Sequence, residues 1–253
     1  MNTYILTIQD KHNVIEKFAK QKLPIEESHI VMGKEDLLGP FQFDEKRSQL
    51  LYDFELSRGM KNCAAGHRKI WAVAKTDSHN GWVQILEDDA QLDVNYAEVL
   101  EILGTLEVDF PLAIILGHSK TVQSNLWFEN LKWPLHKEFK YHGVALGEKT
   151  QNLFGTVGYL LNKRAITLLD TLPVPFWKPD DWQHLQKYGL KVYHLRNPII
   201  WEDFMSHTSD TGSSRQIQHR LYSSNFIREF GSMVKSQLGI RIINKIEDNL
   251  CQF

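Results

Sequence analysis

The sequence predicts an α/β fold in which helices cover a central sheet, followed by a helical C-terminal segment. Short runs of apolar and β-branched residues alternate with stretches of helical periodicity up to about residue 210. Beyond about Ser213 only the helical pattern continues. We therefore expect an α/β domain over residues 1–210 and a basic, amphipathic helical extension over residues 211–253.

The composition is that of a globular protein. The chain has 253 residues, of which 42% are hydrophobic and 24% charged, so it can bury one substantial core. Its two cysteines, Cys63 and Cys251, are too few and too far apart for a disulfide framework or a zinc module. Neither a signal peptide nor an apolar run of about 20 residues is evident. These features predict a cytoplasmic protein.

The expected elements follow in order along the chain. In the first half we expect strands at residues 3–8, 82–89 and 111–117 and helices at residues 13–21, 62–75 and 94–106. In the second half we expect strands at residues 152–162 and 190–200 and helices at residues 163–172 and 180–188. The strand, helix, strand order around residues 82–117 predicts a βαβ unit.

Three acids end the predicted strand that begins at Trp82. If the extended geometry persists, Glu87 and Asp89 point to one side and Asp88 to the other. Two carboxylates that face one spot repel each other unless a cation lies between them, and hard divalent ions prefer oxygen ligands. The acids therefore predict a metal site at the carboxyl end of a strand, where ligands bind in open α/β sheets. A solvated turn is the structural alternative.

The sequence motifs that accompany these acids resemble those of glycosyltransferase family 25, which includes lipooligosaccharide galactosyltransferases. The family's ILEDDA block is present at residues 85–90, and residues 154–165, FGTVGYLLNKRA, are similar to its Gly-Thr-x-Gly-Tyr block. The family's helix with Gly, Cys, His and Trp, and its Pro-x-Asp segment, are matched by Gly59, Cys63, His67, Trp71, Pro179 and Asp181. The departures are Met60, Asn62 and Gly66, which leave the donor sugar undefined.

This resemblance implies a GT-A fold, a Rossmann-like mixed sheet with flanking helices. It also implies that Mn²⁺ or Mg²⁺ holds the diphosphate of a UDP-sugar while a hexose, galactose or glucose, is transferred with inversion to a lipooligosaccharide or lipopolysaccharide core glycan. Asp89 is the first expected metal ligand, with Glu87 and, by analogy with GT-A enzymes, His207 as further ligands. Glu87 and Asp88 are also expected to contact the nucleotide sugar.

The remaining candidate residues have both a functional and a structural interpretation. We expect Thr7, Gly155, Thr156 and Gly158 to contact the nucleotide sugar, although a glycine in a strand also marks a bend or bulge. His67 is expected to be a hydrogen-bonded core histidine, because it shares an apolar helix face with Cys63 and Trp71.

Asp181 is the predicted catalytic base. The family places an Asp after Pro at this point, and a helix N-terminus favours the ionised carboxylate. Capping of that helix is the alternative role for this side chain.

Two alternative functions remain to be considered, together with a membrane and a nucleic acid as candidate partners. A metal-dependent phosphohydrolase would need a nucleophilic aspartate near the first strand, where the sequence offers only Asp10. A non-catalytic module for binding nucleotide sugars or glycans is the other alternative. The basic tail predicts peripheral attachment to the inner face of an anionic membrane, where lipid-linked acceptors are found. With a net charge of −2 and no nucleic-acid motif, we expect no nucleic-acid partner.

Overall fold

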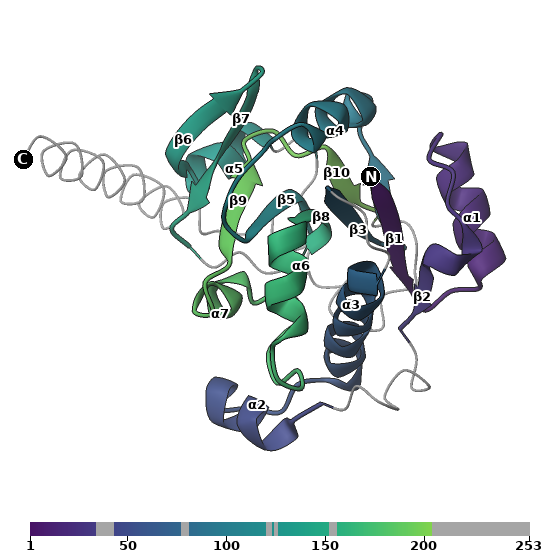
Figure 1. The fold of residues 1–253 in the computed structure, drawn as a ribbon, viewed down its shortest axis with the longest axis vertical. Helices are drawn as coiled ribbons and strands as arrows, with labels where there is room; N and C mark the ends of the chain where they lie inside the picture. The colour runs from purple at the N-terminus through teal and green to yellow at the C-terminus, as the bar shows by residue number, and fades with distance from the viewer. Residues whose placement is uncertain (34–42, 77–80, 120–122, 124–125, 152–155, 204–253) are drawn as a thin grey trace, which may run out of the picture.

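A computed structural model describes residues 1–33, 43–76, 81–119, 123, 126–151 and 156–203, which form a central sheet between two layers of helices (Figure 1). The strands are β1 (Asn2–Thr7), β2 (Ile30–Met32), β3 (Trp82–Glu87), β4 (Ala90–Leu92), β5 (Leu112–His118), β6 (Leu135–Tyr141), β7 (Val144–Lys149), β8 (Thr156–Asn162), β9 (Lys191–Leu195) and β10 (Ile200–Glu202). The helices are α1 (Lys11–Lys20), α2 (Glu45–Tyr52), α3 (Arg58–Thr76), α4 (Tyr96–Gly104), α5 (Leu126–Lys132), α6 (Lys163–Asp170) and α7 (Trp182–Gln186), and a 3₁₀ turn, η1, covers Glu27–His29.

The central sheet is mixed, with the strand order β2-β1-β3-β8-β5-β9-β7-β6. β1 is parallel to β2 and β3, and β5 is parallel to β9. β8 lies between β3 and β5 and is antiparallel to both. The βαβ prediction is therefore correct in strand direction, but β3 and β5 are not neighbours. The predicted α/β fold is confirmed.

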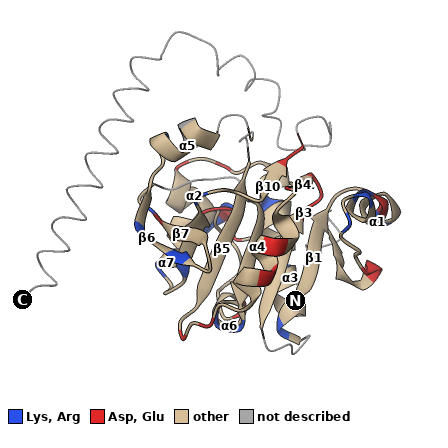
Figure 2. Cartoon of the chain, turned by 90° about the horizontal axis from the view of Figure 1, so that it is seen from above, with Lys and Arg blue, Asp and Glu red and all other residues tan. Residues whose placement is uncertain are grey.

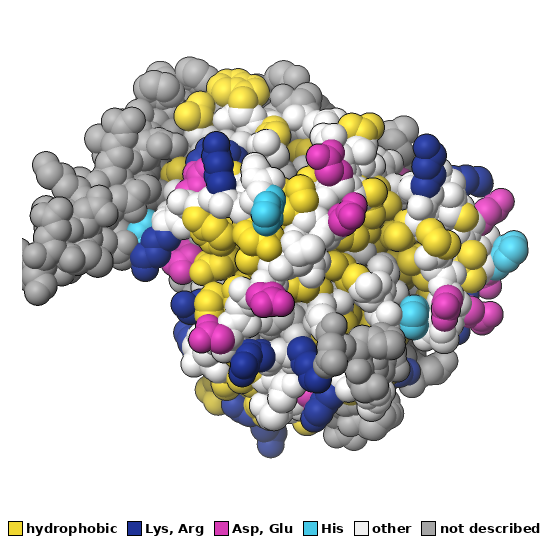
Figure 3. Space-filling model, turned by 45° about the horizontal axis from the view of Figure 1, so that its top comes forward, with side chains coloured by type: hydrophobic (Ala, Val, Ile, Leu, Met, Phe, Trp, Pro, Cys, Tyr) yellow, Lys and Arg dark blue, Asp and Glu magenta, His cyan; other side chains and the backbone are white. Residues whose placement is uncertain are grey.

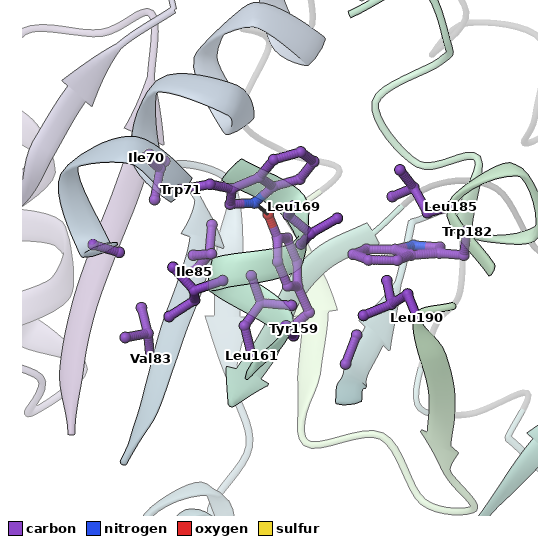
Figure 4. Packing of buried hydrophobic residues seen from close by; sticks show 14 of the residues in the cluster. Ile70, Trp71, Val83, Ile85, Tyr159, Leu161, Leu169, Trp182, Leu185 and Leu190 are labelled. Atoms are coloured by element: carbon purple, nitrogen blue, oxygen red, sulfur yellow. Dashed lines mark hydrogen bonds between the residues drawn. The ribbon is translucent and has the colours of Figure 1, made fainter. Parts of the chain in front are cut away.

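Apolar side chains on the two faces of the sheet form two cores. On one face α3 and α6 cover the sheet, and Trp71, Tyr159 and Trp182 are among the buried side chains (Figure 4). The indole nitrogen of Trp71 donates a hydrogen bond of 3.1 Å to the hydroxyl of Tyr159. On the other face α1 and α4 contribute Phe18 and Leu103 to a second core. Because both faces are covered there, the strands β3 and β5 are almost continuously apolar and buried.

Several short elements of the structure were not predicted from the sequence. The aromatic and histidine-rich stretch from Trp127 to His142 contains most of α5 and the strand β6, which pairs with β7. The strands β2 and β4 have only three residues each, too few for a periodic pattern to be recognised. The boundary near Asp210, His207 and the expected extension over 211–253 lie outside the described residues.

A small second sheet lies at the carboxyl ends of β3 and β5. β10 pairs with β4 antiparallel, with Glu202 opposite Ala90 and Ile200 opposite Leu92. Ile200 packs against two glycines: a Cβ on Gly158 would lie 2.7 Å from its side chain, and a Cβ on Gly117 would overlap its carbonyl oxygen. The register of β5 against β8 shifts at Gly117, which is consistent with this close approach.

We expect Gly117→Ala to lower the free energy of unfolding by about 2–3 kcal/mol, because β10 must shift to admit the new methyl group. Urea denaturation of the purified variant measures this loss. Gly104→Ala is the matched control, because Gly104 ends α4 in a place where a Cβ has room. There alanine should be neutral or stabilising. Equal stability of the two variants would contradict this packing.

Candidate active site

The acidic triplet lies at the carboxyl end of β3, in the middle of the sheet. Glu87 is the last residue of β3, and Asp88 and Asp89 form the turn into β4. Thr7 ends the neighbouring strand β1, and His118 ends β5. Acidic residues lie beside β4 and β10 in Figure 2. The fold therefore places the predicted acids at the sheet edge where ligands are expected.

Glu87 faces helix α3. Its Oε1 lies 3.5 Å from His67 Nε2 and 3.7 Å from Cys63 Sγ. His67 is buried, and its Nδ1 is 2.9 Å from the hydroxyl of Tyr159. The expectation of a hydrogen-bonded core histidine is thus confirmed, although that histidine also borders the site.

Asp88 faces the opposite side, toward β1 and α1. Its Oδ2 accepts hydrogen bonds from the Thr7 hydroxyl, at 2.5 Å, and from the backbone N–H of Ile8, at 3.1 Å. Lys17 donates to the backbone carbonyl of Asp88 at 2.8 Å. Alternation along the strand therefore predicted the directions of Glu87 and Asp88 correctly. Thr7, expected at the nucleotide, holds Asp88 in this structure.

Asp89 has a buried carboxylate oxygen, Oδ1, with no hydrogen-bond partner among the described residues. Its backbone carbonyl accepts a hydrogen bond of 2.9 Å from the N–H of Asp203, which fixes the turn against β10. Burial, followed by the charges of Glu87 and Glu202, raises the pKa of Asp89 well above its usual range. A buried carboxylate crowded by other acids is costly unless a cation neutralises it.

Glu87 shows the same crowding. Burial raises the pKa of Glu87 to about 8, and the negative charges of Asp88 and Asp180 add to the shift. Lys17, which forms an ion pair with Asp203 at 3.6 Å, is the cation that lowers the pKa of Asp89. The carboxylate oxygen of Asp89 without a hydrogen-bond partner and the raised pKa values of Asp89 and Glu87 fit a divalent cation with oxygen ligands, such as Mn²⁺ or Mg²⁺.

Asp181 is the N-cap of α7 and is 6% exposed. Its Oδ1 accepts the N–H of His184 at 3.0 Å, and its Oδ2 accepts the hydroxyl of Tyr52 at 2.7 Å. Both carboxylate oxygens thus have structural roles: Oδ1 caps α7, as in the capping alternative, and Oδ2 binds Tyr52. The preceding residue, Asp180, is the one whose charge raises the pKa values of Glu87 and Cys63.

The remaining residues predicted to contact the nucleotide sugar or the metal lie in three different situations. Thr156 begins β8 in register with His118, whereas Gly155 and His207 lie outside the described residues. Gly158 packs against Ile200 and Leu86, so the space beside it is filled by side chains. This packing fits the structural interpretation of that glycine, and the contact of Gly158 with the nucleotide sugar stays a prediction.

Two further acids border the site: the charges of Asp180 and Glu202 raise the pKa of Glu87, and that of Glu202 also raises the pKa of Asp89. The signal for Glu202 was an acid directly after the apolar residues 199–201. Nothing in the sequence indicated that the half-buried His118 and the buried His194 form a pair, whose rings stack at 5.1 Å toward the ends of β5 and β9. Burial lowers the pKa of both, so both rings are neutral near pH 7.

The exposed surface gives two further observations. On the face in Figure 3, hydrophobic, acidic and histidine side chains occupy the middle, and lysines and arginines lie toward the margins. Within the residues that the structure describes, no helix is both long and apolar enough to cross a membrane.

Comparisons with known proteins were consistent with the sequence motifs. Residues 3–175 match the family model described as glycosyltransferase family 25 (LPS biosynthesis protein). No curated protein matches the chain significantly. Among solved structures, the chain is similar to a putative glucose-1-phosphate thymidylyltransferase from Bacillus anthracis in complex with a sucrose, with 11% identity and a TM-score of 0.32. That match covers 77% of this chain and 86% of the other.

Proposed function

The chain belongs to glycosyltransferase family 25, whose members are LPS biosynthesis proteins, and from this premise we propose a specific reaction. A hexose, galactose or glucose, is transferred from a UDP-sugar to a lipooligosaccharide or lipopolysaccharide core glycan, with inversion at the sugar carbon. The observation that carries this proposal is the orphaned, buried carboxylate oxygen of Asp89 among other acids at the carboxyl edge of the sheet.

In this proposal Asp89 is the principal ligand of Mn²⁺ or Mg²⁺, with Glu87 and Glu202 beside it and His207 as a further candidate. When bound, the cation would neutralise the negative charge that develops on the departing diphosphate. Asp88 and Thr7 hold the turn in position through their 2.5 Å hydrogen bond. Lys17, which is hydrogen-bonded to the carbonyl of Asp88, adds positive charge at the same edge.

The base that accepts the proton of the acceptor hydroxyl is proposed to be one of the adjacent acids, Asp180 or Asp181. The structure favours Asp180, since Asp181 uses both carboxylate oxygens for the α7 cap and Tyr52. A base must also lie near the reacting atoms, and the charge of Asp180 acts on Glu87.

The alternative of a phosphohydrolase has less support from the structure. Asp10, the acid nearest the first strand, is exposed and caps α1 by accepting the N–H of His12 at 2.9 Å. Helix capping therefore accounts for Asp10, and no nucleophilic role is needed to explain it. A non-catalytic module for nucleotide sugars or glycans differs from the proposed enzyme only in turnover.

We expect the purified chain to release UDP slowly from UDP-galactose or UDP-glucose with Mn²⁺, and faster with a lipooligosaccharide core acceptor. Acceptor hydroxyls attack the sugar more effectively than water when they are held in place. A donor screen measures UDP, and NMR of the product gives the anomeric configuration. Release of phosphate from monoesters would instead indicate the hydrolase, and binding without turnover would indicate the module.

The basic residues of the extension over 211–253 suggest that the protein binds its acceptor at a membrane surface. Arg220, Arg228, Lys235 and Arg241 lie in this extension, and each basic residue near an anionic surface contributes about 1 kcal/mol. We propose peripheral attachment at the inner face of the membrane. The full chain should co-sediment with anionic phosphatidylglycerol vesicles at low salt and be released at high salt, whereas neutral vesicles serve as the control. No binding to anionic vesicles at low salt would contradict this proposal.

A further inference from the structure

Three side chains of different chemistry meet beside the acidic turn. Cys63 and His67 are four residues apart in α3, so they project from the same face of that helix. Glu87 approaches them from the end of β3. The Sγ, imidazole nitrogen and carboxylate oxygen of these residues all lie within 4.8 Å of one another.

The contacts between these side chains are long for hydrogen bonds. Glu87 Oε1 lies 3.5 Å from His67 Nε2, whereas N–H···O bonds in proteins usually span about 2.7–3.2 Å. The distance from Glu87 Oε1 to Cys63 Sγ is 3.7 Å. The Cys63 thiol donates this long hydrogen bond to Glu87, so the thiol, the imidazole and the carboxylate have converged with only long contacts between them.

The same separations suit ligands of one tetrahedral ion. With bonds of about 2.3 Å to sulfur and about 2.0–2.2 Å to nitrogen and oxygen, tetrahedral zinc holds its ligand atoms roughly 3.4–3.7 Å apart. Both distances from Glu87 agree with that range, at 3.5 Å and 3.7 Å. Cys63 and His67 would need to approach each other by at most about 1.4 Å.

The surroundings of His67 are those of a metal ligand. Its Nδ1 is 2.9 Å from the Tyr159 hydroxyl, which also accepts the indole N–H of Trp71. When Nδ1 donates its proton to Tyr159, the lone pair of Nε2 faces Cys63 and Glu87. Ligating histidines typically have the second nitrogen fixed in this way.

We propose that Cys63, His67 and Glu87 form a binding site for a borderline transition ion, Zn²⁺ in particular. A thiolate and an imidazole favour zinc over Mn²⁺ or Mg²⁺, which prefer oxygen ligands. The side chain of Glu87 is 28% exposed, so solvent can reach the site and supply the remaining ligand.

This inference does not depend on the proposed transfer reaction. The cation proposed for transfer is held principally by Asp89, and only Glu87 is common to the two sets of ligands. Zinc binding through Cys63 would be observed even in a protein without transferase activity. Conversely, transfer with Mn²⁺ does not require Cys63 as a ligand.

Cobalt binding tests the site, because Co²⁺ replaces Zn²⁺ and absorbs light when a thiolate binds it. We expect the reduced, metal-free full chain to develop the thiolate-to-cobalt charge-transfer band at a ratio of one Co²⁺ per chain. An equal amount of Zn²⁺ should abolish the band. Mn²⁺ at the same concentration should leave it unchanged.

The chain contains only Cys63 and Cys251, so one variant identifies the ligand. Cys251→Ser should keep the full charge-transfer band, whereas Cys63→Ser should lose it while binding UDP as before. Absence of the band in the folded wild-type chain, or its loss in Cys251→Ser, would overturn the proposal. Because Cys251→Ser decides the question alone, misfolding of Cys63→Ser would not prevent a result.

Discussion

Replacing Asp89 with asparagine should reduce the rate of hexose transfer at least about 100-fold. The variant keeps the size of the side chain and the backbone hydrogen bond from Asp203 to residue 89, which stabilises the turn. It removes the negative charge that we propose binds the divalent cation, and one lost electrostatic contact of this kind typically costs about 10²–10³ in rate. The transfer rate at saturating UDP-sugar, with and without Mn²⁺, measures the effect.

Asp109→Asn is the matched control, because Asp109 is exposed and precedes β5 at the other end of the sheet. That variant should transfer hexose at the wild-type rate. Excess chelator should abolish transfer in both the wild type and the control, and Mn²⁺ or Mg²⁺ should restore it. Transfer that persists in chelator, or survives Asp89→Asn nearly unchanged, would show that the acidic turn does not bind a catalytic cation.

The second large effect is expected from Asp180→Asn. If Asp180 accepts the proton of the attacking hydroxyl, its loss should reduce transfer by about 10²–10⁴-fold. Binding of UDP and metal, measured by calorimetry, should remain close to that of the wild type, because the acids of the β3–β4 turn are unchanged.

Asp181→Asn is the matched comparison, one residue further along the chain. The amide can still cap α7, but the Tyr52 hydroxyl loses its charged acceptor. We expect a loss of about 1–3 kcal/mol in unfolding free energy and a smaller decrease in rate. An unchanged melting temperature with most of the transfer rate lost would instead assign the base to Asp181. Wild-type transfer in both variants would move the role to Glu202 or Asp203.

The sequence by itself determined the fold class, the main elements and the position of the acidic turn. Periodicity sufficed for α3, β3 and β5, because each has many buried residues in a regular pattern. Motif resemblance identified the family that the match over residues 3–175 then confirmed. Strand alternation also predicted that Glu87 and Asp88 face opposite sides, since it depends only on local backbone geometry.

Only the tertiary structure decided which of these side chains meet. The insertion of β8 between β3 and β5, and the placement of β10 across the edge, depend on pairings between residues distant in the sequence. Local pattern contains no information on such pairings. They explain why Gly158 packs against Ile200, and why Asp181 bonds to Tyr52, 129 residues away. The meeting of Cys63, His67 and Glu87 likewise follows from the packing of α3 on the sheet, which no single segment specifies.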